Sequence, residues 1–185
     1  MPAALPPSTR HVALLRGINV GGNRRIPMAA LRACFEALGF ANVKTLLASG
    51  NVVFDVPKAC EASLTPMIEA HLERTFGFAT DVILRPVAHL RRMIEASPFK
   101  DITVTPETRR YVTFLRESPT ATLEIPYASA DGDFRILQAS WKEVFSVVMV
   151  SRPGRSGDAM SLLEKIYGRR ITTRNWNTVE RIAAA

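Results

Sequence analysis

Residue types able to hold an anion gather between His11 and Pro27, near the start of the chain. Within this first loop stand Arg16, Gly17, Asn19, Gly21, Gly22, Asn23 and Arg24, followed by Arg25. Glycines let consecutive backbone N–H groups turn toward one point, and arginines offer forked donors to a phosphate or a carboxylate. The same residues are also typical of a tight turn in which asparagine side chains satisfy backbone groups. The spacing matches neither a GxGxxG nor a Walker A loop, so it predicts a binding site without naming a reaction.

Ser49 and Asn51 flank a glycine in a second polar turn, which separates two apolar runs at 43–48 and 51–56. Such a pattern predicts a β-hairpin. A further apolar strand is expected at 12–16, just before the first loop. If these strands belong to a βαββαβ unit, the first and third are antiparallel neighbours, and the end of one lies beside the start of the other. Topology therefore predicts that both polar turns share one edge of the sheet.

A third polar cluster lies near the end of the chain, where a short strand is expected to lead into the closing helix. It contains Arg174, Asn175, Trp176 and Asn177. We expect Trp176 to anchor an interface between two halves of the protein. Its polar neighbours then either cap the helix or contact a ligand. In the second case this cluster and the first loop form one site. The candidate ligand-binding residues are Arg16, Gly17, Asn19, Gly21, Gly22, Asn23, Arg24, Ser49, Asn51, Arg174, Asn175 and Asn177.

Hydrophobic periodicity over the first half predicts the order β-α-β-β-α-β, which is the ferredoxin-like unit. The expected strands are 12–16, 43–48, 51–56 and 81–85, and the expected helices cover 27–38, 64–76 and 87–96. In the second half the expected strands are 110–116, 134–139, 143–150 and 170–173, with helices over 159–167 and up to Ile182. No helix is predicted in the turn-rich stretch 119–132. The fold class is therefore α+β, with two halves related to the ferredoxin-like unit.

Two short matches indicate an internal duplication. Leu72–Gly77 resembles Leu163–Gly168, each ending a helix with an aromatic residue and a glycine, and the strand at 12–16 resembles the strand at 110–116. The expected domains are a loose tail over 1–9, a first ferredoxin-like subdomain over 10–97, a linker over 98–108 and a second, degenerate subdomain over 109–185.

The net charge of +7 and a pI near 10.0 favour polyanionic partners, because binding a nucleic acid releases its counterions. The arginines stand in scattered pairs rather than in one tract, which favours dispersed charge over a dedicated nucleic-acid surface. An RNA-recognition sheet needs exposed aromatics on its central strands, where this sequence offers only Phe54. No apolar run approaches the roughly 20 residues that span a bilayer, so no membrane partner is expected.

Isolated Cys34 and Cys60, together with a start that lacks a signal-peptide pattern, predict a cytoplasmic protein. The histidines are scattered, so neither a metal nor a cofactor is predicted. Ser49 does not stand in a GxSxG elbow, and topology places no histidine near it. Catalytic residues therefore stay unassigned, and enzyme activity stays an open question.

Three stretches together resemble the bacterial family named domain of unknown function 1697. They are Leu14–Gly22, Ser49–Phe54 and Thr172–Val179, and the resemblance spans Arg10 to Ile182. It implies a cytoplasmic α+β protein of two ferredoxin-like-related subdomains, and it implies no activity. Its signature residues fall on the polar turns that topology brings together. We therefore expect binding of an anionic, phosphorylated small ligand. The alternatives are sequence-tolerant nucleic-acid binding and a structural or protein-interaction role.

Overall fold

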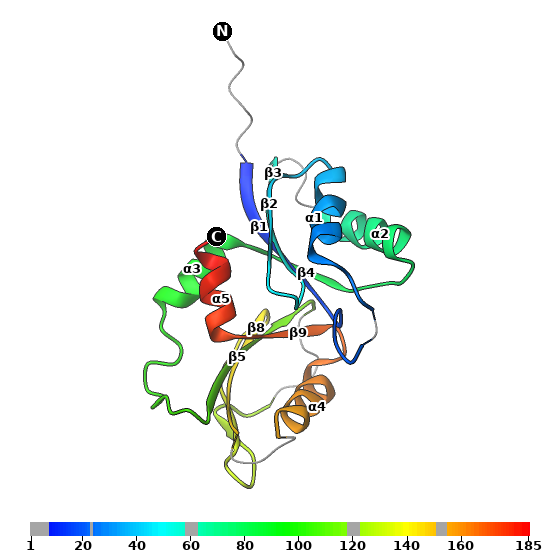
Figure 1. Ribbon diagram of the computed structural model, residues 1–185. Helices are drawn as coiled ribbons and strands as arrows, with labels where there is room; N and C mark the ends of the chain where they lie inside the picture. The colour runs from blue at the N-terminus through cyan, green and yellow to red at the C-terminus, as the bar shows by residue number, and fades with distance from the viewer. Residues whose placement is uncertain (1–7, 23, 58–62, 118–122, 151–154) are drawn as a thin grey trace. The chain divides into compact units, whose positions relative to one another are not determined.

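The computed structural model describes residues 8–22, 24–57, 63–117, 123–150 and 155–185 (Figure 1). The chain divides into two compact units. The first unit runs to Arg91 and takes in the last residues, 182–185, and the second unit comprises residues 92–181. Each unit is built around one antiparallel sheet with helices, which confirms the predicted α+β class.

The first unit has the strand order β2-β3-β1-β4, which is that of the ferredoxin-like βαββαβ unit. Its elements are β1 (Ser8–Leu15), α1 (Met28–Ala37), β2 (Ala41–Leu46), β3 (Asn51–Pro57), α2 (Leu64–Phe76), β4 (Val82–Pro86) and the beginning of α3 (Val87–Glu95). All neighbouring strands are antiparallel, and Leu14 stands opposite Asn51 in the β1–β3 ladder. The end of β1 therefore lies beside the start of β3, as topology predicts.

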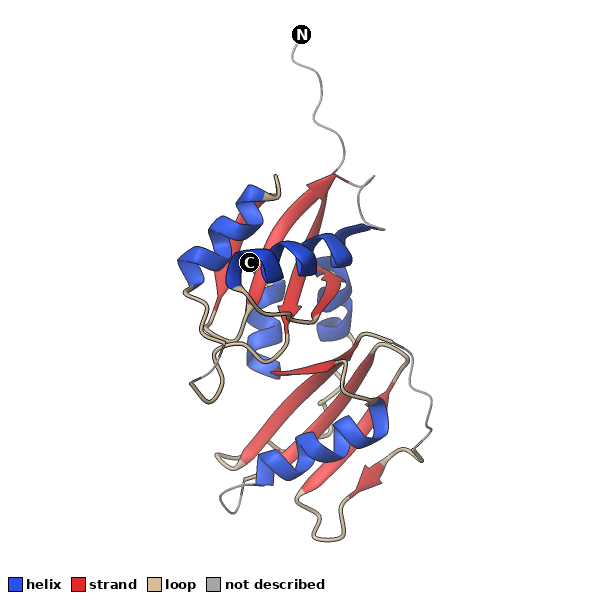
Figure 2. Ribbon diagram, turned by 90° about the vertical axis from the view of Figure 1, so that its right-hand side faces the viewer, coloured by secondary structure: helices blue, strands red, loops and turns tan. Residues whose placement is uncertain are grey.

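One face of this sheet packs against α1 and α2 (Figures 1 and 2). Phe35 of α1 and Phe54 of β3 meet edge to face, with ring centroids 5.2 Å apart, and Ile68 and Leu72 of α2 join the same apolar cluster. Each fully buried side chain of this size stabilises the fold by about 1.5–3 kcal/mol. Gly77 ends α2 in a left-handed conformation with φ 77°, which explains why the helical periodicity stops there.

Strand β1 is buried on both faces. Val12, Ala13 and Leu14 each have 0% exposed surface, and β1 lies between β3 and β4 in the sheet. A strand buried on both sides carries a continuous apolar run rather than an alternating one. The central position of β1 in the sheet thus explains the continuous apolar run at 12–15.

The second unit has the strand order β6-β7-β8-β5-β9. Its elements are β5 (Thr108–Leu115), β6 (Tyr127–Ala128), β7 (Phe134–Ala139), β8 (Glu143–Met149), α4 (Arg155–Tyr167), β9 (Ile171–Asn175) and α5 (Trp176–Ala183) up to Arg181. Ala159 and Leu163 of α4 pack on one face of this sheet. The described residues 123–132 contain no helix, in agreement with the sequence, and only the short β6 pairs with β7 there.

The two units repeat one backbone plan. Without β6, the order β7-β8-β5-β9 matches β2-β3-β1-β4 strand for strand. At the end of the first central strand, Leu15 N–H donates to Gly50 O, and in the second unit Leu115 N–H donates to Lys142 O. One residue later, Arg16 N–H donates to Asp81 O, and Arg116 N–H donates to Arg170 O. Val12 stands opposite Arg85 in the first sheet, as Val112 stands opposite Arg174 in the second. This common register supports an internal duplication, in which the described part of the second copy lacks the first helix.

The end of β9 differs from the sequence prediction. The strand was expected to end at Thr173, but it continues to Asn175, because β5 goes on pairing with it as far as Tyr111. Arg174 therefore lies inside a strand rather than in the junction between strand and helix.

Candidate functional site

Hydrogen bonds join the first loop to the second turn. The N–H of Leu15 donates to the carbonyl oxygen of Gly50 at 2.9 Å, and the side-chain amide of Asn19 donates to the carbonyl oxygen of Ala48 at 2.8 Å. The two polar turns that the sequence singles out therefore share the edge at which β1 ends and β3 begins.

Asn19 also closes the first loop on itself. Its side-chain oxygen accepts from the N–H of Ile26 at 2.8 Å, and its side-chain nitrogen donates to the Ile26 carbonyl oxygen at 3.1 Å. Both N–H donors of the amide are thus used within the protein. The backbone φ of 55° at Asn19 lies in the left-handed region, which asparagine tolerates better than most residues. Asn19 therefore shapes the loop.

Gly50 allows the first loop to approach the second turn closely. Its φ of 77° is left-handed, and a Cβ atom at this position would lie 2.7 Å from Cδ1 of Ile18. Ile18 is itself only 2% exposed. A glycine is therefore required where Ile18 packs over the turn.

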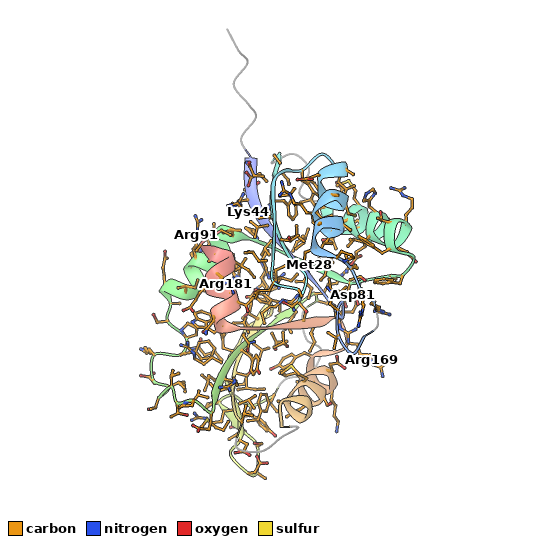
Figure 3. All side chains as sticks on the ribbon, in the orientation of Figure 1. Met28, Lys44, Asp81, Arg91, Arg169 and Arg181 are labelled. Atoms are coloured by element: carbon orange, nitrogen blue, oxygen red, sulfur yellow. The ribbon has the colours of Figure 1, made fainter. Side chains whose placement is uncertain are left out.

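A hollow of about 490 Å³ opens between the first loop and the start of α1, and we call it the α1 hollow. Its lining residues are Asn19, Gly22, Arg25, Ile26, Pro27, Met28 and Ala48. Figure 3 labels Met28 at the beginning of α1. The first turn of α1 carries no acidic residue, and no described side chain caps its N–H groups. These N–H groups carry partial positive charge, so they contribute a positive potential at the start of α1.

A second hollow of about 490 Å³ lies between the first loop, α2 and the start of β4, and we call it the acidic hollow. It is lined by Arg16, Arg24, Pro66, Glu69, Ala70, Glu73, Ala79, Thr80 and Asp81. The Arg24 guanidinium lies 5.7 Å from the centre of the Phe78 ring. Two of the predicted arginines therefore line a hollow that also holds three carboxylates, and these carboxylates disfavour an anion there.

The remaining predicted residues of the first unit differ in burial: one is buried in the second turn and the others described are exposed. Asn51 is fully buried, and its amide donates to a backbone carbonyl at 2.8 Å and to Oγ of the exposed Ser49 at 3.1 Å. These bonds shape the second turn. Gly17 and Gly21 are exposed and left-handed. Asn23 lies outside the described residues.

The third polar cluster belongs to the second unit, and Arg174 is its buried polar member. Nη1 of Arg174 donates to Oγ1 of Thr172 at 2.8 Å and to the carbonyl oxygen of Thr173 at 2.9 Å, and the residue is 7% exposed. Burial lowers the pKa of Arg174 to about 10, so the guanidinium remains charged at neutral pH. Arg85, its counterpart in β4, makes the same bond to the preceding carbonyl oxygen, at 2.9 Å. The buried arginine is thus a feature of the repeated plan.

Trp176 anchors an aromatic cluster within the second unit. Its ring lies edge to face with Phe99, at a centroid distance of 5.0 Å, and 6.5 Å from Phe145. The guanidinium of Arg110 covers Phe99 at 5.8 Å and donates to Oδ1 of Asn177 at 3.4 Å. Asn175 is exposed. Phe99 falls in the segment predicted to be a linker, where the absence of periodicity hid its packing role.

The third cluster and the first loop were expected to form one site if the polar residues contact a ligand. That shared site stays a prediction.

The described part of the chain offers neither a cluster of metal ligands nor a membrane-spanning helix. It contains no group of three or more histidine, cysteine or acidic residues able to hold a metal ion. Cys34 is buried, and burial raises the pKa of its thiol, while Cys60 lies outside the described residues. None of the described helices is long and apolar enough to cross a bilayer.

Comparison with known proteins gives a family and a fold. The family described as "Protein of unknown function (DUF1697)" matches residues 8–138. A search of curated proteins finds no match. Among solved structures, the conserved bacterial protein SP0830 from Streptococcus pneumoniae is similar, with a TM-score of 0.72 at 22% identity. The similarity covers 96% of this chain and 98% of that chain, and at this identity it shows the fold alone.

Proposed function

The chain belongs to the DUF1697 family of proteins of unknown function, and from that premise we propose that its first unit binds a small anionic ligand in the α1 hollow. The favoured class is a phosphorylated small molecule. The observation that carries the proposal is the first turn of α1, which opens onto the hollow without an acidic residue or a cap from a described side chain. A phosphate at such a helix start accepts hydrogen bonds from backbone N–H groups and is favoured by the helix dipole.

Charge and size support the same choice of hollow. Arg25 lies on the rim of the α1 hollow, and none of the described residues that line it is acidic. The acidic hollow, with Glu69, Glu73 and Asp81, has the opposite character. A volume of about 490 Å³ lies within the range of roughly 300–1,000 Å³ that small-molecule pockets occupy. The overall charge of +7 raises the local concentration of any anion.

A thermal-shift and calorimetry panel tests the proposal on the full chain. The panel contains inorganic phosphate, nucleoside monophosphates and sugar phosphates. A specific ligand at a hundredfold excess over its Kd stabilises the protein by about 2.7 kcal/mol, which gives a shift of several degrees. Arg25→Ala should weaken the response at least severalfold, because it removes the charged donor on the rim.

Arg32→Ala is the matched control. Arg32 lies on the same helix, is exposed and pairs with Glu36 at 2.8 Å outside the α1 hollow, so its removal should leave ligand affinity unchanged. Absence of stabilisation by every anion at millimolar concentration would contradict the proposal. Equal affinity of the Arg25→Ala variant and the natural chain would move the ligand away from this hollow.

A further inference from the structure

The turn between β7 and β8 presents Trp141 to solvent. The residue is 62% exposed, whereas Trp176 is 5% exposed. Hydrogen bonds of Ser140 fix the backbone of this turn. Its N–H donates to the carbonyl oxygen of Glu143 at 2.8 Å. Its Oγ accepts from the N–H groups of Lys142 at 3.1 Å and Glu143 at 2.9 Å. A large ring on a fixed turn provides a flat contact surface that needs little ordering before it binds.

Cationic residues from three strand ends accompany this ring. The Lys142 ammonium lies 4.1 Å from the centre of the Trp141 ring. The bonds from Leu115 N–H to Lys142 O and from Arg116 N–H to Arg170 O place these residues at the same end of the sheet. We call the turn and the neighbouring strand ends together the Trp141 edge. Its members are Ser140, Trp141, Lys142, Glu143, Arg116, Glu117, Arg169 and Arg170.

The charge of the Trp141 edge is positive. Four of its members are cationic, and of its two acidic members Glu143 is 4% exposed. The other, Glu117, accepts from Nη1 of Arg170 at 2.6 Å. An exposed aromatic ring alone fits many partners, but a ring flanked by cations in a protein of net charge +7 fits a polyanion with flat, apolar groups.

We propose that the Trp141 edge binds an unpaired stretch of nucleic acid, with a base stacked on the Trp141 ring and phosphates near Lys142, Arg169 and Arg170. Stacking of a base on an aromatic ring is stronger than an exposed cation–π contact, so a base can compete with Lys142 for the ring. On the central strands, the aromatic rings of Phe54 and Phe114 are buried and those of Tyr111 and Phe145 are partly buried, so they form no exposed platform of the RNA-recognition kind. The stacking ring stands on a hairpin turn instead.

The test measures anisotropy of a labelled dT oligomer of about 12 nucleotides, a length within the usual site size, with the full chain in about 50 mM salt. Trp141→Ala should weaken binding by roughly 5- to 150-fold, and Trp141→Phe should recover part of the loss because it keeps a ring. Val104→Ala is the control, since Val104 is 58% exposed in the same unit and lies outside the edge. Its affinity should equal that of the natural chain.

Two further arms separate stacking from charge alone. An abasic oligomer of the same length and charge, and a duplex, should each bind at least several times more weakly than the dT oligomer. Arg170→Ala should weaken binding of all oligomers and reduce the log–log salt slope by about one. Equal affinities of the Trp141→Ala variant and the natural chain, or of the abasic and dT oligomers, would overturn the proposal. Absence of oligomer binding would also overturn it and would favour a protein partner for Trp141.

Discussion

The side-chain amide of Asn19 donates to the carbonyl oxygen of Ala48 across 2.8 Å, and this bond ties the first loop to the second turn. The same amide exchanges two bonds with the backbone of Ile26. One side chain thus holds both the shape of the loop and its place on the sheet edge, where the α1 hollow opens.

Asn19→Asp should destabilise the protein more than its small change in size indicates. The carboxylate keeps an acceptor for the Ile26 N–H but loses both donors, and its charge faces the carbonyl oxygens of Ile26 and Ala48. We expect a loss of about 1–3 kcal/mol in urea unfolding at neutral pH. If the variant unfolds at the same urea concentration as the natural chain, the amide does not hold the loop.

Gly50→Ala should combine backbone strain with a steric clash. The left-handed backbone costs about 1–3 kcal/mol for a residue with a Cβ atom, and the clash with Ile18 at 2.7 Å adds to it. Gly132→Ala is the matched control, because Gly132 has a φ of 74° but an added Cβ would meet nothing within 4 Å. Equal losses in the two variants, measured by denaturant unfolding, would contradict the packing of Ile18 over Gly50.

Ala29→Glu should have opposite effects on folding and binding. Ala29 is an exposed residue in the first turn of α1, where a carboxylate gains about 0.3–1 kcal/mol from the helix dipole. The same charge repels an anionic ligand from the α1 hollow. We expect a slightly higher melting temperature together with loss of ligand affinity in calorimetry. Ala29→Gln should keep the affinity, and a glutamate that left it unchanged would place the ligand elsewhere.

Trp176→Ala should cost about 3–5 kcal/mol of unfolding free energy, because it empties the space beside Phe99 and Phe145. Trp141→Ala is the same substitution at an exposed position and should change stability by less than about 0.5 kcal/mol. Thermal and chemical unfolding of both variants measure the difference. Similar losses in the two would contradict the assignment of Trp176 to a packed aromatic cluster.

Acid should weaken the first unit partly through Asp55. Burial alone would raise the pKa of this carboxyl, but hydrogen bonds from Asn42 and Arg10, both at 2.7 Å, and the charge of Arg10 hold it below its ordinary value. A lowered folded-state pKa gives stability that is full above about pH 4 and is lost as the pH falls through the folded value. Asp55→Asn should therefore show a smaller loss of stability between pH 5 and pH 2 than the natural chain. An unchanged pH dependence would exclude Asp55 as a contributor.

The sheet topology could be predicted because it depends on periodicity and turns. Strand β1 reads as a continuous apolar run, and Gly77 marks the end of α2, so the βαββαβ order of the first unit follows from spacing alone. The proximity of the two polar turns then follows from the antiparallel pairing of β1 and β3. Strand order and the proximity of the two turns are therefore predictable, because both follow from the order of apolar runs and turn residues along the chain.

The directions of side chains in the first loop could not be predicted in the same way. Arg16 and Arg24 line the acidic hollow, whereas Arg25 lines the α1 hollow. The loop backbone is left-handed at Asn19 and at Arg24. Neither residue type signals this conformation in a sequence, because both also occur in ordinary turns, so the division of the arginines cannot be predicted. Similarly, Arg174 lies within β9 because the ladder with β5 extends past the expected strand end, and a ladder's length is set by its partner strand.

The pairing of β1 also has a consequence for the growing chain. Val12 stands opposite Val53 in β3 and opposite Arg85 in β4, so both hydrogen-bonding partners of β1 are synthesised much later than β1 itself. During translation the apolar segment Val12–Leu15 leaves the ribosome before either partner strand, and the β1 edge that pairs with β4 stays unpaired until β4 has emerged. Such strands are the segments that chaperones protect and that aggregate when folding is slow. The register at Val112 repeats this requirement in the second unit, where β5 must wait for β8 and β9.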